Sequence, residues 1–314
     1  MGFDPGYRTG CKVAVVDETG KVLDTNVVYC TLPNHDKDKA KKILMDMILR
    51  NNVNLISIGN GTASKESEIF ISDLLKEIDR EVFYIMTNEA GASVYSASKL
   101  ATEEFPQYDV ALRSAVSIGR RLQDPLAELV KIDPKSIGVG QYQHDMNQKK
   151  LGETLGGVVE NCVNSVGVDL NTASPSLLSY VSGISSAVSK NILAYREENG
   201  KFMSRKELLK VAKLGPKAFE QCAGFLRIAE SKEVLDNTSV HPESYKAAKE
   251  ILKEAGFSDD DVRAGRAKGI AAKLGNIEKT AEKIGIGKIT CEDIIKELEK
   301  PGRDIRESMP KPVL

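Results

Sequence analysis

The chain has 314 residues, of which 41% are hydrophobic and 28% charged, and its net charge is −1. This length and composition predict a globular protein of two or three domains. The sequence has neither a run of roughly 18 apolar residues nor a signal-peptide pattern, which argues against a membrane protein and favours the cytoplasm. Because the net charge is near zero, any nucleic-acid site must be a local basic patch.

The first 132 residues predict an α/β domain with a mixed sheet. Strand-like segments at 1–3, 11–16 and 21–29 come first, and a turn at 17–20 joins the last two as a hairpin. Helices and strands then alternate, with helices at 36–51, 64–79, 91–104 and 109–132 and strands at 53–58 and 81–86. Strand pairs followed by βα units favour a mixed sheet covered by helices on both faces.

This order, with Asp4 at the end of the first strand, is similar to the RNase H-like arrangement. Such enzymes hold two metal ions with acids from the first strand, a later strand end and the last helix. Asp4 takes the first place and Glu89 the second, but Arg113 stands where the third acid belongs. Asp109, one turn earlier, is a substitute that also fits an i,i+4 pair with Arg113. After the fourth strand, Asn60 is neutral.

These residues predict a vestigial site. A cation at position 113 would repel a metal ion and could instead hold a phosphate. We therefore expect Asp4, Glu89 and Asp109 to be non-catalytic, while a nuclease that uses them with Mg²⁺ or Mn²⁺ stays open as an alternative. Arg120 and Arg121, next along the helix, are better placed to pair with Asp124 or Glu128 than to bind nucleic acid.

The middle of the chain carries two helix–turn–helix units, at 178–192 and 209–223. Their turns read Gly183-Ile184-Ser185 and Lys213-Leu214-Gly215. The start of a helix presents unpaired N–H groups and a positive dipole end to phosphate, and glycine allows a close approach. The residues that we expect to contact nucleic acid are Gly183, Ile184, Ser185, Lys190, Lys213, Gly215 and Lys217.

Charge supports this prediction, because basic residues outnumber acidic ones between 190 and 232. The alternative is a packed helical spacer whose basic face is merely solvated. The region 233–314 predicts further helices at 241–255, 259–274, 277–284 and 291–299, with a third turn at Gly285-Ile286-Gly287. The tail at 309–314 predicts an extended linker, and both ends suggest a fragment of a longer protein.

The five cysteines and three histidines are scattered, and no Cys-x-x-Cys pair occurs. This pattern favours neither a zinc site nor a disulfide framework, so we expect no metal and no cofactor. It is also typical of a protein from a reducing compartment.

The chain resembles the bacterial Tex family of transcription accessory proteins. The resemblance rests on long segments that include 2–17, 58–64, 88–96, 118–132, 137–145 and 168–174. It implies a YqgF-type RNase H-like domain at 1–132, a connector helix at 133–157, tandem helix-hairpin-helix units at 158–232 and a helical accessory domain with a C-terminal linker at 233–314. It also implies a degenerate nuclease site.

We therefore expect a nucleic-acid-binding transcription accessory protein that grips the backbone of DNA or RNA with little sequence preference. Transcription or translation machinery is a further expected partner, and no membrane is. The alternatives are the metal-dependent nuclease and a non-catalytic scaffold on polymerase or ribosome.

Overall fold

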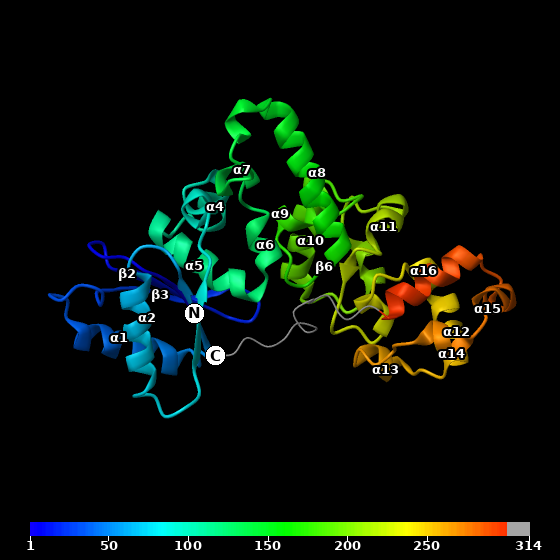
Figure 1. The fold of residues 1–314 in the computed structure, drawn as a ribbon, viewed down its shortest axis with the longest axis horizontal. Helices are drawn as coiled ribbons and strands as arrows, with labels where there is room; N and C mark the ends of the chain where they lie inside the picture. The colour runs from blue at the N-terminus through cyan, green and yellow to red at the C-terminus, as the bar shows by residue number, and fades with distance from the viewer. Residues whose placement is uncertain (300–314) are drawn as a thin grey trace. The chain divides into compact units, whose positions relative to one another are not determined.

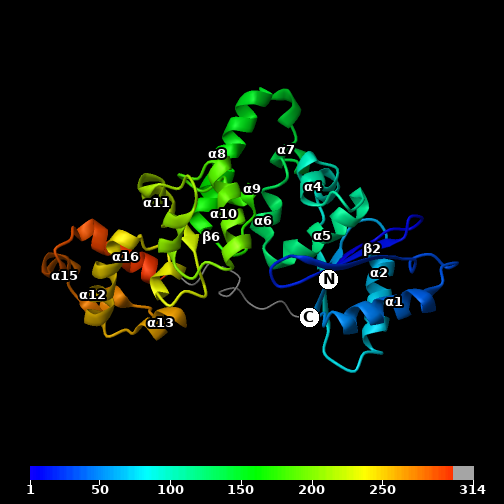
Figure 2. The same cartoon turned by 180° about the vertical axis from the view of Figure 1, so that it is seen from behind.

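The structure is a computed structural model that describes residues 1–299. It divides into two compact units, Met1–Leu155 and Gly156–Leu314. Over the described residues, no helix combines the length and the apolar character needed to cross a membrane. Figures 1 and 2 show the fold from opposite sides.

The first unit contains one five-stranded sheet with helices packed against it. Its strands are β1 (Gly2–Asp4), β2 (Cys11–Val16), β3 (Val22–Val28), β4 (Leu55–Gly59) and β5 (Phe83–Thr87). Its helices are α1 (Lys37–Arg50), α2 (Ser64–Leu75), α3 (Ala92–Ser96), α4 (Lys99–Glu104), α5 (Val110–Gln123), α6 (Pro125–Leu129), α7 (Pro134–Ile137) and the 3-10 turn η1 (Gln143–Asp145). Helix α8 (Gln148–Val166) runs from the first unit into the second.

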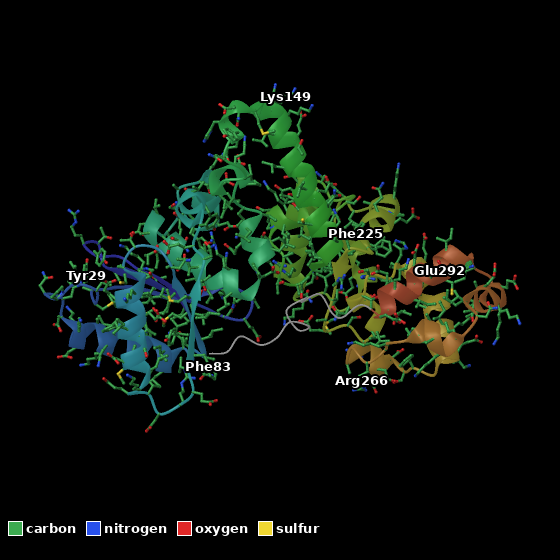
Figure 3. All side chains as sticks on the ribbon, viewed as in Figure 1. Tyr29, Phe83, Lys149, Phe225, Arg266 and Glu292 are labelled. Carbon is green, nitrogen blue, oxygen red and sulfur yellow. The ribbon has the colours of Figure 1, made fainter. Side chains whose placement is uncertain are left out.

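The strand order is β3-β2-β1-β4-β5, which confirms the mixed sheet. Strands β1, β2 and β3 are antiparallel neighbours, whereas β1, β4 and β5 are parallel. The side chain of Asp17 fixes the β2–β3 turn by accepting hydrogen bonds from the backbone N–H groups of Thr19 and Lys21. Tyr29, which follows β3, and Phe83 on β5 are exposed at opposite edges of the sheet (Figure 3).

Helices cover both faces of the sheet, as the sequence predicted. Helices α1 and α2 bury Leu44, Met47, Phe70 and Ile71 against the strands in the largest cluster of the first unit. Helix α5 packs on the opposite face, against β1 and β2 (Figure 1). There the backbones of Gly2 and α5 lie so close that a side chain at Gly2 would overlap the carbonyl oxygen of Ala115.

Two predicted helices are each split in two. The segment 91–104 breaks between α3 and α4, where Ser98 caps α4 by accepting the Ala101 N–H. The segment 109–132 breaks between α5 and α6, because Asp124 turns extended and caps α6 ahead of Pro125. Helix α2 begins at Ser64, as predicted, and Ala63 with φ 64° precedes it.

As far as residue 299, the second unit is helical with one short strand pair. Its elements are β6 (Val168–Asp169), α9 (Pro175–Leu178), α10 (Ser186–Asn199), η2 (Arg205–Lys210), α11 (Pro216–Cys222), β7 (Leu226–Arg227), η3 (Val234–Asn237), η4 (Pro242–Ser244), α12 (Tyr245–Ala255), α13 (Asp259–Arg263), α14 (Ile270–Leu274), α15 (Ile277–Ile284) and α16 (Lys288–Glu299). Strands β6 and β7 are parallel and join the two ends of the region that contains both predicted hairpins. This confirms the predicted all-α part of the fold.

The elements after Val234, coloured yellow to red in Figure 1, share their own core. Gly256 ends α12 in a left-handed conformation, as its position in the sequence predicted. The helix predicted at 259–274 is instead two short helices, because Gly265 and Gly269 both take positive φ between α13 and α14. The predicted linker at 309–314 lies outside the described residues.

Candidate nucleic-acid interface

Asp4, at the end of β1, is a largely buried carboxylate. Burial raises its pKa to about 6, and a nearby Glu89 adds to the rise, while a hydrogen bond from Ser114 and the charge of Lys12 oppose it. The side chain that α5 presents to Asp4 is therefore the neutral Ser114. In the vestigial-site prediction this is the place of the third acid.

Glu89 lies just beyond β5, beside a loop that two glycines leave open for it. A Cβ at Gly59 or at Gly61 would stand 2.1 or 1.7 Å from one of its carboxylate oxygens. The backbone N–H of Glu89 donates to the side-chain oxygen of Asn60 at 3.2 Å. The glycines of this loop thus make room for a carboxylate of the same chain, which gives them a structural role.

Arg113 does not stand among the carboxylates, and this part of the prediction was wrong. Its guanidinium is buried and donates to the carbonyl oxygens of Phe105 and Ser96 and to the hydroxyl of Thr102. It therefore holds the loop before α5 to the end of α3.

Asp109 is not a ligand candidate either. Its side chain caps α5 by accepting the N–H of Leu112 at 2.8 Å, and the expected ion pair with Arg113 is not formed. Within residues 1–299, no group of three or more His, Cys, Asp or Glu side chains is arranged to hold a metal ion. The neighbouring carboxylates are therefore Asp4 and Glu89, with Ser114 beside them.

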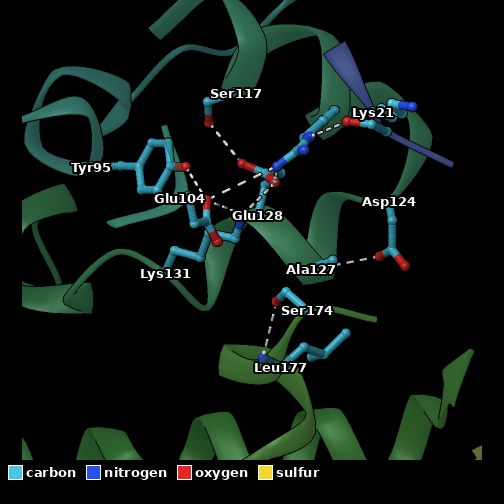
Figure 4. Close-up of polar contacts among 12 residues, drawn as sticks. Lys21, Tyr95, Glu104, Ser117, Asp124, Ala127, Glu128, Lys131, Ser174 and Leu177 are labelled. Carbon is cyan, nitrogen blue, oxygen red and sulfur yellow. Dashed lines mark hydrogen bonds and ion pairs between the residues drawn. The ribbon is translucent and has the colours of Figure 1, made fainter. Parts of the chain in front are cut away.

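The expected pairing of Arg120 with Glu128 is confirmed, within the buried network of Figure 4. Glu128 also accepts from Ser117 at 3.0 Å and from Lys131 at 2.8 Å. Arg121 was expected to pair similarly, but it donates to the carbonyl oxygens of Asn88 and Ala90. Both arginines thus hold segments of the first unit together.

The two predicted hairpin turns have the same backbone conformation, residue for residue. Gly183 and Lys213 both take positive φ, of 81° and 66°. The next residue is buried in each turn, Ile184 at 6% exposure and Leu214 at 3%. The third residue is an extended N-cap in each, Ser185 before α10 and Gly215 before α11. Lys213 therefore occupies a left-handed position that glycine fills in the first turn.

The two hairpins pack reciprocally. The side-chain amide of Asn191 on α10 donates to the carbonyl oxygen of Ala212 in the second turn, at 2.7 Å. Conversely, a Cβ at Gly183 in the first turn would stand 2.6 Å from the Cβ of Gln221 on α11. Asn191 and Gln221 each lie six positions after the N-cap of their helix, although Asn191 makes a hydrogen bond and Gln221 a close packing contact. The two turns are neighbours as a result.

This packing gives Gly183 a role different from the one that the sequence suggested. The sequence suggested that glycine admits a phosphate to each turn. At Gly183 the missing Cβ makes room for α11, whereas no atom lies within 4 Å of the Cβ position of Gly215. Only the second turn is open in the way that the sequence suggested. The contacts of Asn191 and Gln221 were missed, although the identical spacing of these residues from the two turns was a visible signal.

Three of the arginines counted in the basic region serve the fold. Arg196 donates to the carbonyl oxygens of Leu170 and Ala173. Arg205 is 1% exposed and donates to the carbonyl oxygens of Leu226 and Val240 and to the hydroxyl of Tyr245. Arg227 is buried and donates to Ser239. The exposed charge comes instead from lysines, which include Lys190, Lys206, Lys210, Lys213 and Lys217.

The third predicted turn shares the left-handed first residue of the other two. Gly285 has φ 79°, Ile286 is half-buried, and Gly287 precedes α16. It joins α15 to α16, which pack against each other. The sequence had predicted this third turn, although its flanks match those of the first two turns less well.

Comparison with known families covers most of the chain. Residues 1–123 match the family model described as the Tex protein YqgF-like domain. Residues 163–227 match a helix-hairpin-helix motif, and residues 233–306 match an HHH domain. The second model spans both interlocked hairpins, and the third spans the turn at Gly285.

Relatives extend well beyond this chain. A protein of Bacillus subtilis (strain 168), YdcI, is 53% identical over 314 residues, which are 100% of this chain and 44% of the relative. Protein YhgF of Escherichia coli (strain K12) is 54% identical over 98% of this chain and 39% of its own length. The transcriptional accessory protein Tex of Neisseria gonorrhoeae is 53% identical over 98% of this chain and 40% of its own length.

The chain thus spans less than half the length of these curated relatives. Similarity at this level across all of its domains confirms the resemblance seen in the sequence. The chain belongs to the Tex family, and it spans the YqgF-like domain and the helix-hairpin-helix domains of that family.

Proposed function

We propose that this chain binds nucleic acid through the phosphate backbone, with little preference for base sequence, as part of a cytoplasmic transcription accessory protein. The observation that carries the proposal is the pair of neighbouring hairpin turns with matching conformation, at Gly183 and Lys213. Exposed Lys190, Lys213 and Lys217 lie on these turns or on the helices that follow. Contacts made by backbone N–H groups and lysines carry no sequence information by themselves.

The dipole of helix α10 adds to the attraction of phosphate at the first turn. It is 14 residues long and begins at the first turn, so its positive dipole end faces outward there. Ser185 already accepts the N–H of Val188. The N–H groups of Ser186 and Ala187 precede the first intrahelical bond and stay available to an anion. The name of the Neisseria gonorrhoeae relative supports the link to transcription.

We propose further that the YqgF-like domain does not hydrolyse nucleic acid. Two-metal hydrolysis requires ligands that clamp both the attacking and the leaving oxygen. Asp4 and Glu89 supply two carboxylates, whereas Ser114 faces them from α5 and Asp109 caps that helix. Cleavage that requires Mn²⁺ or Mg²⁺ and disappears in Asp4→Asn would instead establish the nuclease.

Fluorescence anisotropy across a salt series, in EDTA, tests the binding proposal. The titrations use labelled single- and double-stranded DNA and RNA. If about three phosphates are neutralised, log affinity falls against log salt with a slope of roughly −2 to −3. A strong preference for one sequence at constant salt would contradict the backbone mode. Absence of binding at low salt, with co-purification of polymerase or ribosome, would favour the scaffold alternative.

Charge reversal at the second turn identifies the surface. We expect Lys213→Glu with Lys217→Glu to weaken binding at least tenfold and to flatten the salt slope by about 1 to 2. The matched control is Lys39→Glu with Lys42→Glu on α1, which changes the charge equally at exposed positions of the first unit. Equal losses in both variants would show a diffuse charge effect. A lowered melting temperature in the Lys213→Glu, Lys217→Glu variant alone would show that these lysines stabilise the fold.

A further inference from the structure

The β2–β3 hairpin carries two cysteines in contact beneath its surface. The Sγ atoms of Cys11 and Cys30 are 3.7 Å apart, and the residues are 0% and 1% exposed. Cys11 begins β2 and pairs with Val28 across the hairpin, and Cys30 follows two residues after Val28 on the same buried side. Buried cysteines often act as small apolar residues. Here, however, the two thiols lie in direct contact, and the Cys11 sulfur also lies 3.6 Å from the carbonyl oxygen of Gly6 and 3.8 Å from the hydroxyl of Ser67.

The surroundings favour reaction between the two sulfurs. A disulfide bond is about 2.05 Å long, so the sulfurs must close by roughly 1.7 Å, which side-chain rotation and a small backbone shift can supply. Cys30 lies beyond the last residue of β3, outside the strand ladder, where the backbone is easier to move. The hydrogen bond from Cys30 lowers the pKa of the Cys11 thiol, and the charge of Lys12 acts in the same direction. Cys30 has its pKa raised and keeps its proton.

We propose that Cys11 and Cys30 form a redox-active dithiol that a hydroperoxide converts to a disulfide. The Cys11 thiolate attacks the O–O bond of the peroxide and becomes a sulfenic acid, with loss of one water after proton uptake. The sulfur of Cys30 then attacks the Cys11 sulfur, forms the S–S bond and expels the second water. Two thiols lose two electrons and two protons, and hydrogen peroxide is reduced to two waters. An external dithiol reverses the step by exchange.

The bond would act on the loop that follows Asp4. The Cys11 thiol donates to the carbonyl oxygen of Gly6 at 3.6 Å, and the Thr31 hydroxyl donates to the same oxygen at 2.8 Å. A disulfide has no S–H group, so Gly6 would keep only the Thr31 donor. The crosslink would also close the hairpin into a covalent loop, which restricts the unfolded chain.

Mass spectrometry of the native chain tests the proposal. A Cys162→Ser background removes the exposed thiol, and the lone buried Cys222 and Cys291 serve as internal controls. The protein is incubated with hydrogen peroxide, quenched with catalase, and alkylated after denaturation. We expect a Cys11–Cys30 peptide lighter by two hydrogens that dithiothreitol reverses, with Cys222 and Cys291 still alkylated. The melting temperature should rise by on the order of 5 °C.

Two variants separate crosslinking from general oxidation. Cys30→Ser and Cys30→Ala each remove the partner, so the mass change and the rise in melting temperature should both disappear. Prolonged peroxide treatment of the native Cys162→Ser protein that leaves Cys11 and Cys30 alkylatable would overturn the proposal. So would oxidation of Cys11 to sulfinic acid without any bridge to Cys30.

Discussion

Two glycines in the paired hairpins have different roles: one allows the helices to pack, and the other leaves space for a ligand. Gly183 has φ 81°, and a Cβ there would meet Gln221 at 2.6 Å. Gly215 has φ −83° and an empty Cβ position. We expect Gly183→Ala to lower the free energy of unfolding by about 2–3 kcal/mol, because both strain and overlap oppose it.

Gly215→Ala is the matched control, and its stability should change by less than about 0.5 kcal/mol. If a phosphate approaches the second turn closely, the same change should weaken nucleic-acid binding severalfold. Urea unfolding followed by circular dichroism gives the stabilities, and anisotropy gives the affinities. Equal destabilisation by the two substitutions would contradict the different roles assigned to these glycines.

Asp4 gives the first unit a dependence on pH. Its folded pKa of about 6 lies above the ordinary 3.8, so the folded state holds the proton more tightly than the unfolded chain does. The carboxyl therefore contributes stability below pH 3.8 that is lost as pH rises through 6. We expect Asp4→Asn to raise the free energy of unfolding by on the order of 2 kcal/mol at pH 7.5 and to have little effect at pH 4. Urea unfolding at both pH values measures this difference. An equal effect of the substitution at the two pH values would show that the titration of Asp4 is not its cause.

At the scale of elements, the sequence predicted whether a segment is a helix or a strand better than it predicted where each element begins and ends. The strand pattern and the hairpin at Asp17 were enough to predict the mixed sheet, because alternation and turn chemistry are local properties. The breaks at Ser98 and Asp124 were missed, because the apolar helical pattern continues past both residues. The pattern alone does not show that each side chain caps a new helix. The hairpin turns were located correctly, and their equivalence rests on backbone dihedrals that residue types alone did not fix.

The candidate site was harder to predict than the fold. The sequence placed Arg113 near Asp4 from its position on the helix, but one residue of helical rotation puts Ser114 there instead. The basic region contained arginines that the sequence could not distinguish from surface lysines. Arg205 reaches the segment 235–245 through contacts between residues 30 to 40 positions apart, which no local pattern records.

At the scale of the whole molecule, α8 contains the boundary between the two compact units. Gly152, Gly156 and Gly157 lie within this continuous helix, and no atom lies within 4 Å of the Cβ positions of Gly156 and Gly157. Each glycine disfavours the helix by about 1 kcal/mol relative to alanine. We expect Gly156→Ala with Gly157→Ala to slow limited proteolysis within 150–160 severalfold. Unchanged cleavage there, with an unchanged pattern elsewhere, would show that α8 opens for another reason.

Ser114 has a consequence for protein design. The backbone of α5 already carries a side chain to the buried carboxyl of Asp4, and the Gly59–Gly61 loop already makes room for Glu89. A designer who wished to install a divalent-metal centre in this scaffold would therefore start with Ser114→Asp, leaving the chain's architecture untouched. On this backbone, a metal centre would then require only side-chain substitutions, with no new fold.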